Sequence, residues 1–149
     1  MTCRGEVRPG TGERGQTTLL ILGFFLIAVM LVGVVVDASA AYLQRQALNA
    51  LADGAALSAA DGVQGAQVYT SGLGATAQID PTAARAYVAT YLAQTRAHER
   101  YPGLVYRVLP AGDSVTVQVS APLDLPIPPP GWTAEPWVGG VASAVVPVG

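Results

Sequence analysis

The side chains that could do chemistry in this chain are few and scattered. His98 is the single histidine, and it stands in the run RAHER over residues 96–100, at the predicted end of a helix. A cation at that end interacts favourably with the helix dipole. A general base needs an oriented partner and a zinc site needs three or four ligands, and no such cluster accompanies His98. The sequence therefore predicts no catalytic residue, no cofactor and no metal site.

Other chemical signatures are missing as well. The sequence has no G-x-S-x-G, no H-E-x-x-H and no phosphate-binding glycine loop, and Asp113 and Asp124 fit turns. Cys3 is the only cysteine, which excludes an intrachain disulfide. The eight basic residues are all arginines, spread from Arg4 to Arg107 without a cluster, in a chain of net charge -2. We therefore expect no enzyme, no nucleic-acid partner and no small-molecule substrate.

Gly15 marks a bond at which a processing enzyme could cut. It lies between the charged Glu13-Arg14 pair and a polar, then apolar, stretch that begins at Gln16, which is where a prepilin peptidase would act. Ala38-Ser39-Ala40 also has the small-x-small form of a signal-peptidase site, although the apolar stretch before it exceeds the usual signal length of about 7–15 residues. An intact start, a start at Gln16 and a start at Ala41 all stay open.

The stretch from Gln16 to Val36, QTTLLILGFFLIAVMLVGVVV, carries no charge. As a helix it spans roughly 30 Å, the thickness of one bilayer core. A buried helix of a soluble protein normally keeps a polar face, whereas this stretch is apolar all round. Charged residues make up only 12% of the chain, against roughly 25% in soluble domains. The sequence predicts a transmembrane helix over 16–36, with the lipid bilayer as partner.

Arginine asymmetry predicts the orientation of this helix. Arg4, Arg8 and Arg14 precede it, and Arg45 is the only basic residue in roughly the next twenty. By the positive-inside rule, residues 1–15 form a cytoplasmic leader and the C-terminal part is extracytoplasmic. We expect a single-pass protein of the cell's inner, or cytoplasmic, membrane.

Residues 37–60 predict a helical arm beyond the membrane, because they contain no proline and are rich in Ala and Leu. The arm is amphipathic, and its apolar stripe of mostly small residues allows close helix approach. That stripe could cover the chain's own sheet or pack on other subunits, and both uses stay open. The candidates for helix packing are Asp37, Leu43, Ala47, Leu51 and Gly54.

Several arm residues and both tryptophans are candidates for partner contact. Asp37 at the outer end of the span either marks the interface or pairs with a positive group of a neighbouring subunit. The tryptophans either cover the sheet as buried lids or contact the membrane interface or a partner, since indole is amphipathic. The candidate contact residues are Tyr42, Arg45, Asp53, Trp132 and Trp137.

The rest of the chain predicts a small exported domain over 80–149, after a Gly-rich flexible connector over 61–79. Asp80-Pro81 provides an N-cap and a first-turn proline for a helix from Pro81 to Arg100. Two alternating runs around a turn indicate a β-hairpin, and a Val-rich stretch indicates a third strand. These runs are Leu104–Leu109, Ser114–Ser120 and Trp137–Val146, with the turn over 110–113.

The segment over 122–136 holds six prolines and is predicted to be an extended loop, because each proline removes a ladder donor. The expected fold class is α+β: a long N-terminal transmembrane helix that continues into the arm, then a helix packed on a small antiparallel sheet.

The N-terminal third resembles a known family. Its elements match the N-terminal module of the Tad (tight adherence) Flp-pilus-assembly proteins, the TadE/TadG-like group. This resemblance implies a pilin-like or pilus-assembly-associated protein of the bacterial envelope, with other pilus-assembly or envelope proteins as partners and no enzymatic activity. One departure is Leu20, where pilins carry a Glu five residues after the cleaved Gly. The matching elements are RGQTT over 14–18, Val36-Asp37, Tyr42, RQALN over 45–49 and ADGAAL over 52–57.

A second functional hypothesis comes from a different class. If the apolar stretch is a removed signal peptide, the mature chain is an exported envelope binding domain unrelated to pili.

Overall fold

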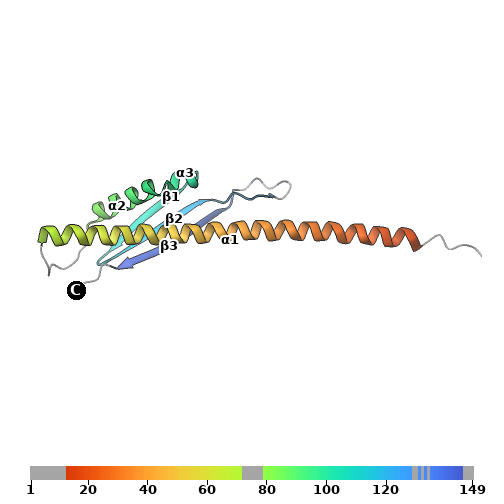
Figure 1. Cartoon of the computed structure of the whole chain (residues 1–149), viewed down its shortest axis with the longest axis horizontal. Coiled ribbons are helices and arrows are strands. Elements are labelled where there is room, and N and C mark those ends of the chain that lie inside the picture. The colour runs from red at the N-terminus through yellow and green to blue at the C-terminus, as the bar shows by residue number, and fades with distance from the viewer. Residues whose placement is uncertain (1–12, 72–78, 129–130, 132, 134, 146–149) are drawn as a thin grey trace, which may run out of the picture.

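A computed structural model describes residues 13–71, 79–128, 131, 133 and 135–145 of the chain. A helix of 59 residues is followed by two shorter helices and a three-stranded antiparallel sheet. The first and second helices pack on one face of that sheet (Figure 1). The expected α+β class is confirmed. The elements are α1 (Glu13–Ser71), α2 (Pro81–Gln94), α3 (Ala97–Arg100), β1 (Val105–Ala111), β2 (Ser114–Pro122) and β3 (Trp137–Val145).

Helix α1 is continuous over 59 residues, which is a length of about 90 Å at the standard helical rise. It includes both the predicted span and the predicted arm. It also extends to Ser71, so residues 61–71 are helical and do not belong to the connector expected over 61–79. The helix persists here because Val63 is buried and the ring of Tyr87 packs where a side chain on Gly62 would stand. Residues 72–78 lie outside the described residues.

Helix α2 begins as predicted and ends earlier. The Asp80 carboxylate accepts a hydrogen bond from the Thr82 amide at 2.8 Å, and Pro81 occupies the first turn. At the other end the Thr95 hydroxyl donates to the Tyr91 carbonyl at 2.9 Å, and Arg96 adopts a left-handed conformation with φ 52°. These two residues break the helix predicted over 81–100 into α2 and the single turn α3.

The sheet has the strand order β1-β2-β3, with every neighbouring pair antiparallel. Ala111 pairs with Ser114, so the hairpin turn consists of Gly112 and Asp113 alone and is tighter than the turn predicted over 110–113. Gly112 has φ 63°, which a glycine adopts without strain. Pro110 is tolerated inside β1 because β1 is an edge strand.

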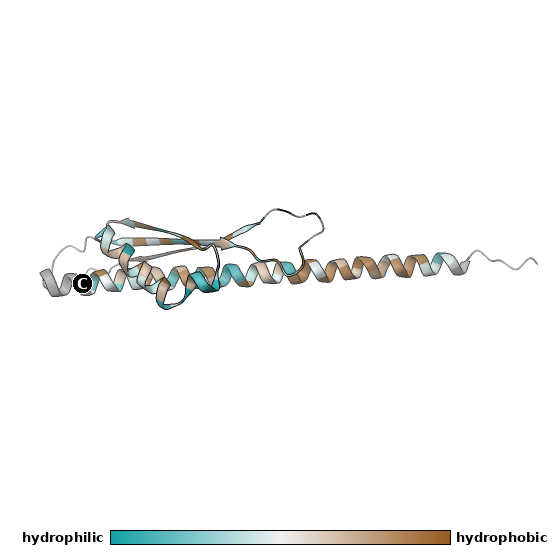
Figure 2. Ribbon diagram, turned by 90° about the horizontal axis from the view of Figure 1, so that it is seen from above, coloured by the Kyte–Doolittle hydropathy of each residue, from teal (hydrophilic) through white to brown (hydrophobic). Residues whose placement is uncertain are grey.

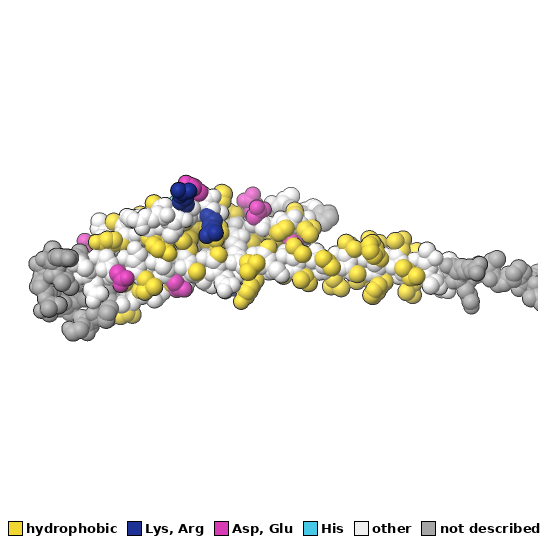
Figure 3. All heavy atoms as spheres, in the orientation of Figure 1, with side chains coloured by type: hydrophobic (Ala, Val, Ile, Leu, Met, Phe, Trp, Pro, Cys, Tyr) yellow, Lys and Arg dark blue, Asp and Glu magenta, His cyan; other side chains and the backbone are white. Residues whose placement is uncertain are grey.

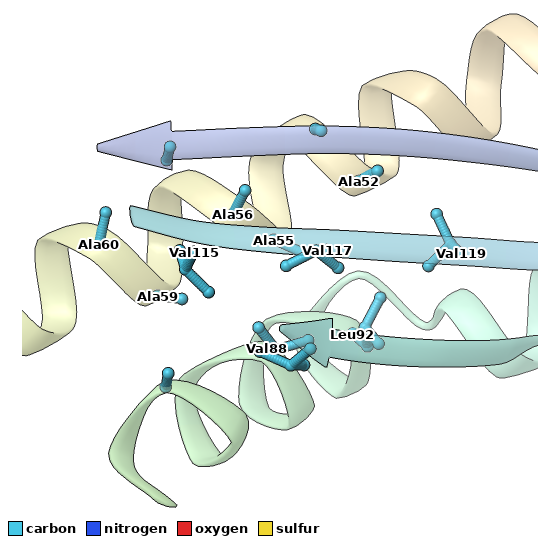
Figure 4. Close-up of a cluster of buried hydrophobic side chains, with 14 of the residues drawn as sticks. Ala52, Ala55, Ala56, Ala59, Ala60, Val88, Leu92, Val115, Val117 and Val119 are labelled. Carbon is cyan, nitrogen blue, oxygen red and sulfur yellow. The ribbon is translucent and has the colours of Figure 1, made fainter. Parts of the chain in front are cut away.

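The core of the domain lies between the sheet and the two longer helices. Figure 4 shows the β2 valines pointing between the alanines of α1 and the apolar side chains of α2. No polar or charged side chain is buried among the described residues. The C-terminal half of α1 therefore forms one wall of the core, and residues 80–149 do not enclose a core by themselves. The central residues are Ala52, Ala55, Ala56, Ala59, Ala60, Val88, Leu92, Val115, Val117 and Val119.

Helix α1 and the sheet approach each other at backbone distance. A Cβ atom added to Gly140 of β3 would lie 2.5 Å from the Asn49 amide nitrogen and 2.6 Å from the Leu48 carbonyl oxygen. Backbone atoms of a helix cannot swing aside as the end of a side chain can. Glycine at position 140 thus sets how deeply the sheet sits on the helix.

Replacing Gly140 by alanine should force β3 away from α1. We expect Gly140→Ala to lower the free energy of unfolding by about 2–3 kcal/mol, in the upper range for overpacked cores. The measurement is urea unfolding of the full chain in detergent micelles, followed by circular dichroism. The neighbouring Gly139→Ala serves as control, because its Cβ would approach the Val119 carbonyl oxygen only to 3.2 Å. Equal losses in the two variants would contradict this account of Gly140.

Candidate functional site

The N-terminal half of α1 projects beyond the sheet, and its apolar window is not buried by the rest of the described chain. Its apolar side chains are exposed, and Figure 3 shows them gathered along the projecting part of the helix. Among the described residues, α1 is the one helix long and apolar enough to cross a membrane, and none of its most apolar window is buried. This exposure separates it from the buried core helix of a soluble protein, which passes the same test of length and composition.

The Pro-rich loop between β2 and β3 turns back along α1 toward this projecting part. The Leu123 amide donates to the Pro136 carbonyl at 2.7 Å and closes the base of the loop. Beside it, the Gln44 side-chain amide donates to the Pro122 carbonyl at 2.7 Å. The loop thus begins against the arm of α1.

Farther along the same loop, the Ile127 amide donates to the Asp37 carboxylate at 3.0 Å. Figure 2 shows the loop reaching α1 at the edge of the apolar stretch. We call the Asp37–Ile127 hydrogen bond the latch. It joins residues 90 positions apart in the sequence and holds the loop against the outer end of the predicted span.

Asp37 therefore has a partner within its own chain, which neither sequence hypothesis for this residue included. Trp137 is the first residue of β3 and is 55% exposed, so the interpretation of Trp137 as a buried lid is wrong. Trp132 lies outside the described residues. Gly15 and Gln16 lie near the start of α1 and are exposed, and cleavage between them stays a prediction.

The arm residues expected to form one apolar stripe separate into two surroundings. Ala47 and Leu51 are half-buried and line a shallow groove with Tyr91 of α2. A side chain on Gly54 would collide with the Tyr91 hydroxyl, so Gly54 packs on its own domain. Leu43 and Leu57, by contrast, are exposed.

The polar arm candidates Tyr42, Arg45 and Asp53 are all exposed. Tyr42 and Asp53 share the outward side of α1 with Leu43 and Leu57, whereas Arg45 stands seven residues before the buried Ala52 and so lies on the side that faces the sheet. We call this surface the outward face of the arm. No structural observation shows a partner on it, so its role in partner contact stays a prediction.

Sequence reasoning missed the residues that cover the sheet. Leu48, Ala52, Ala55 and Ala59 follow one another at steps of 4, 3 and 4, which is a regular helical face. The same spacing occurs on other faces of this arm, because small residues surround it on nearly every side. Periodicity alone therefore could not select the buried face.

The polar residues singled out in the sequence lie apart from one another in the described part of the chain. His98 is exposed, with its ring centroid 6.3 Å from that of Tyr106. Asp113 and Asp124 are exposed, Asp113 at the hairpin turn and Asp124 in the loop. Within the described part of the chain, no group of three or more His, Cys, Asp or Glu side chains could hold a metal ion.

Comparison with known proteins identifies the long helix as the recognisable part of the chain. Residues 15–62 match the Tad family model, whose description reads "Putative Flp pilus-assembly TadE/G-like". No curated protein and no solved structure matches the chain. The matched segment covers the predicted span and most of the arm, including the wall of the core. The resemblance noted in the sequence is thus confirmed, and it supports a pilus-assembly-associated membrane protein.

The latch is open to a direct test. Asp37→Ala removes the acceptor, and we expect the Ile127 amide to exchange its hydrogen with solvent roughly 3- to 10-fold faster, because a net hydrogen bond is worth about 0.5–1.5 kcal/mol. The measurement is amide exchange of the full chain in micelles, followed by nuclear magnetic resonance. Asp53→Ala, an equally drastic change at an exposed acid of the same helix, should leave that rate unchanged. An unaltered Ile127 rate in Asp37→Ala would show that the latch does not form.

Proposed function

We propose that this chain is a single-pass protein of the cytoplasmic membrane that takes part in pilus assembly through contacts of its extracytoplasmic part. The observation that carries the proposal is that one helix holds both the apolar span and the segment matching the pilus-assembly family. The proposal assigns the chain no catalytic step. The expected partners are other pilus-assembly or envelope proteins.

The orientation rests on charge. Arg4, Arg8 and Arg14 precede the span, which favours a cytoplasmic N-terminus. A reporter that is active only outside the cytoplasm should therefore be active when it is fused after Gly149. An inactive reporter on a stably produced chain would reverse the orientation and place the sheet in the cytoplasm.

The contact surface that we propose is the outward face of the arm. Leu43, Ala50 and Leu57 stand at intervals of seven residues, and all three are exposed. Residues seven apart lie nearly above one another on a helix, so they form an apolar seam of the kind along which two helices pack. The chain's own sheet packs on another side of α1, through Leu48 and Ala52, and Ala50 of the seam borders the groove against α2.

The open face of the sheet is the competing surface. Val141 and Val145 of β3 point away from the helices and are each 60% exposed. They are as exposed as Leu43 (62%) and Leu57 (57%), so exposure does not choose between the two surfaces. The outward face is favoured because it lies within the segment that matches the family, residues 15–62.

The two surfaces can be separated by matched double variants. Leu43→Gln with Leu57→Gln should lower cross-linking to other envelope proteins several-fold, because two polar side chains interrupt the apolar seam. Both changes are at exposed positions in a helix and preserve its charge, so the fold should be unaffected. The measurement is the yield of cross-linked complexes in cells, with circular dichroism of the purified variants.

Val141→Gln with Val145→Gln is the control and should leave the yield unchanged. If the control pair abolishes cross-linking and the arm pair does not, the partner binds the sheet and the proposed contact surface is wrong. If neither pair affects cross-linking, the contact does not involve either apolar surface.

A further inference from the structure

The Pro-rich loop occupies a defined height relative to the span. Apolar residues of α1 continue without a charge up to Val36, and Asp37 is the next residue. A bilayer has a hydrocarbon core of about 30 Å and a total thickness of about 40–45 Å, so each headgroup layer is roughly 5–8 Å deep. Asp37 therefore lies in the headgroup layer once α1 spans the membrane. The latch distance of 3.0 Å places the Ile127 amide in the same layer.

The backbone of this part of the loop is suited to a water-poor environment. Residues 126–128 read Pro-Ile-Pro, so Ile127 is the only one of the three with a backbone N–H group. That single donor is taken by Asp37. An unpaired backbone donor costs several kcal/mol in hydrocarbon and less in the headgroup layer. The described part of this segment thus has no unpaired N–H donor to expose to a lipid surface.

The side chains near the latch are apolar or amphipathic. Ile127 is 52% exposed although it is held against α1, and Pro126 and Pro128 are exposed beside it. Tyr42 stands five residues beyond Asp37, on another side of α1 from the latch, and is also exposed, with an aromatic ring and hydroxyl typical of membrane interfaces. These residues fit a surface that is partly apolar and partly wet.

The charges close to the latch do not favour an anionic partner. Asp37, Asp124 and Glu135 are all acidic, and they are the charged residues of the latch and of the described part of the loop. A surface rich in phosphate monoesters or acidic protein would be repelled. A zwitterionic lipid surface, which offers both choline groups and acyl chains, is not.

From these observations we propose that the Pro-rich loop is a second membrane contact, in which Ile127 and its flanking prolines rest in the outer headgroup layer and are held there by the latch. The proposal depends on the membrane anchoring of α1 argued above and is independent of pilus assembly. This loop contact brings the exported domain against the lipid surface at one side of α1. It also fixes the rotation of the domain about the axis of the helix.

The test uses the full chain in phosphatidylcholine vesicles, with Cys3→Ser to remove the native thiol. Ile127→Cys carries an environment-sensitive fluorophore, and lipids with a nitroxide near the headgroup serve as quenchers. Val141→Cys, on the open face of the sheet, is the matched exposed control. We expect the label at Ile127 to be quenched several-fold more than the label at Val141. Asp37→Ala should bring the quenching at Ile127 down to the control level, whereas Asp37→Asn, which retains an acceptor oxygen, should preserve most of it.

A label at Val29→Cys, within the span and about 12 Å deeper than Asp37, reports whether α1 itself is inserted when the quencher is a lipid with its nitroxide in the middle of the acyl chain. If Val29 is quenched and Ile127 is no more quenched than Val141, the loop does not touch lipid and the proposal is overturned while anchoring stands. If the Ile127 label has blue-shifted emission without quenching, it is covered by protein, which overturns the proposal too. If Val29 is not quenched, the anchoring of α1 fails and the lipid contact fails with it.

Discussion

The close seating of the sheet on α1 is the constraint from which the rest of this structure follows. A sheet of three strands over a short helix buries too little apolar surface to be stable alone. Here the missing wall is supplied by the alanine-rich C-terminal half of α1, and glycine at position 140 lets the strand backbone approach the helix backbone. Small side chains on both surfaces bury less area per residue but let the backbones of the helix and the strand lie closer together. Tyr87 and Tyr91 of α2 use the same device, because each packs over a glycine of α1.

One consequence is that the predicted membrane span and the wall of the domain's core belong to the same continuous helix, α1. Helix α1 passes without interruption from its exposed apolar half into the core, so the domain cannot reorient on a hinge between them. The latch between Asp37 and Ile127 ties the far end of the sheet's loop to the same helix. The outward face of the arm, which we propose as the contact surface, is thus fixed in height and rotation relative to the apolar half of α1.

The fold was largely predictable from local patterns, and the departures have physical causes. Alternation identified the strands, the Asp80-Pro81 pair fixed the start of α2, and the uncharged run identified the exposed apolar part of α1, whose membrane crossing stays a prediction. The connector over 61–79 was partly wrong because glycine reduces helix propensity, while Gly62 is retained by the packing of Tyr87. The buried face of the arm was not predictable, since alanines surround it. Asp37 could be singled out by position, but its partner is a backbone amide 90 residues away. Every residue except proline has such an amide, so the sequence does not indicate which one binds Asp37.

The central claim is that α1 is at once the anchor and an indispensable wall of the domain. The most direct measurement is urea unfolding of a fragment that spans residues 79–149, compared with one that spans residues 41–149, which retains the alanine face of the helix. We predict a cooperative transition for the longer fragment and none for the shorter one, because only the former can enclose Val115, Val117 and Val119. A cooperative transition of residues 79–149 alone would contradict the claim.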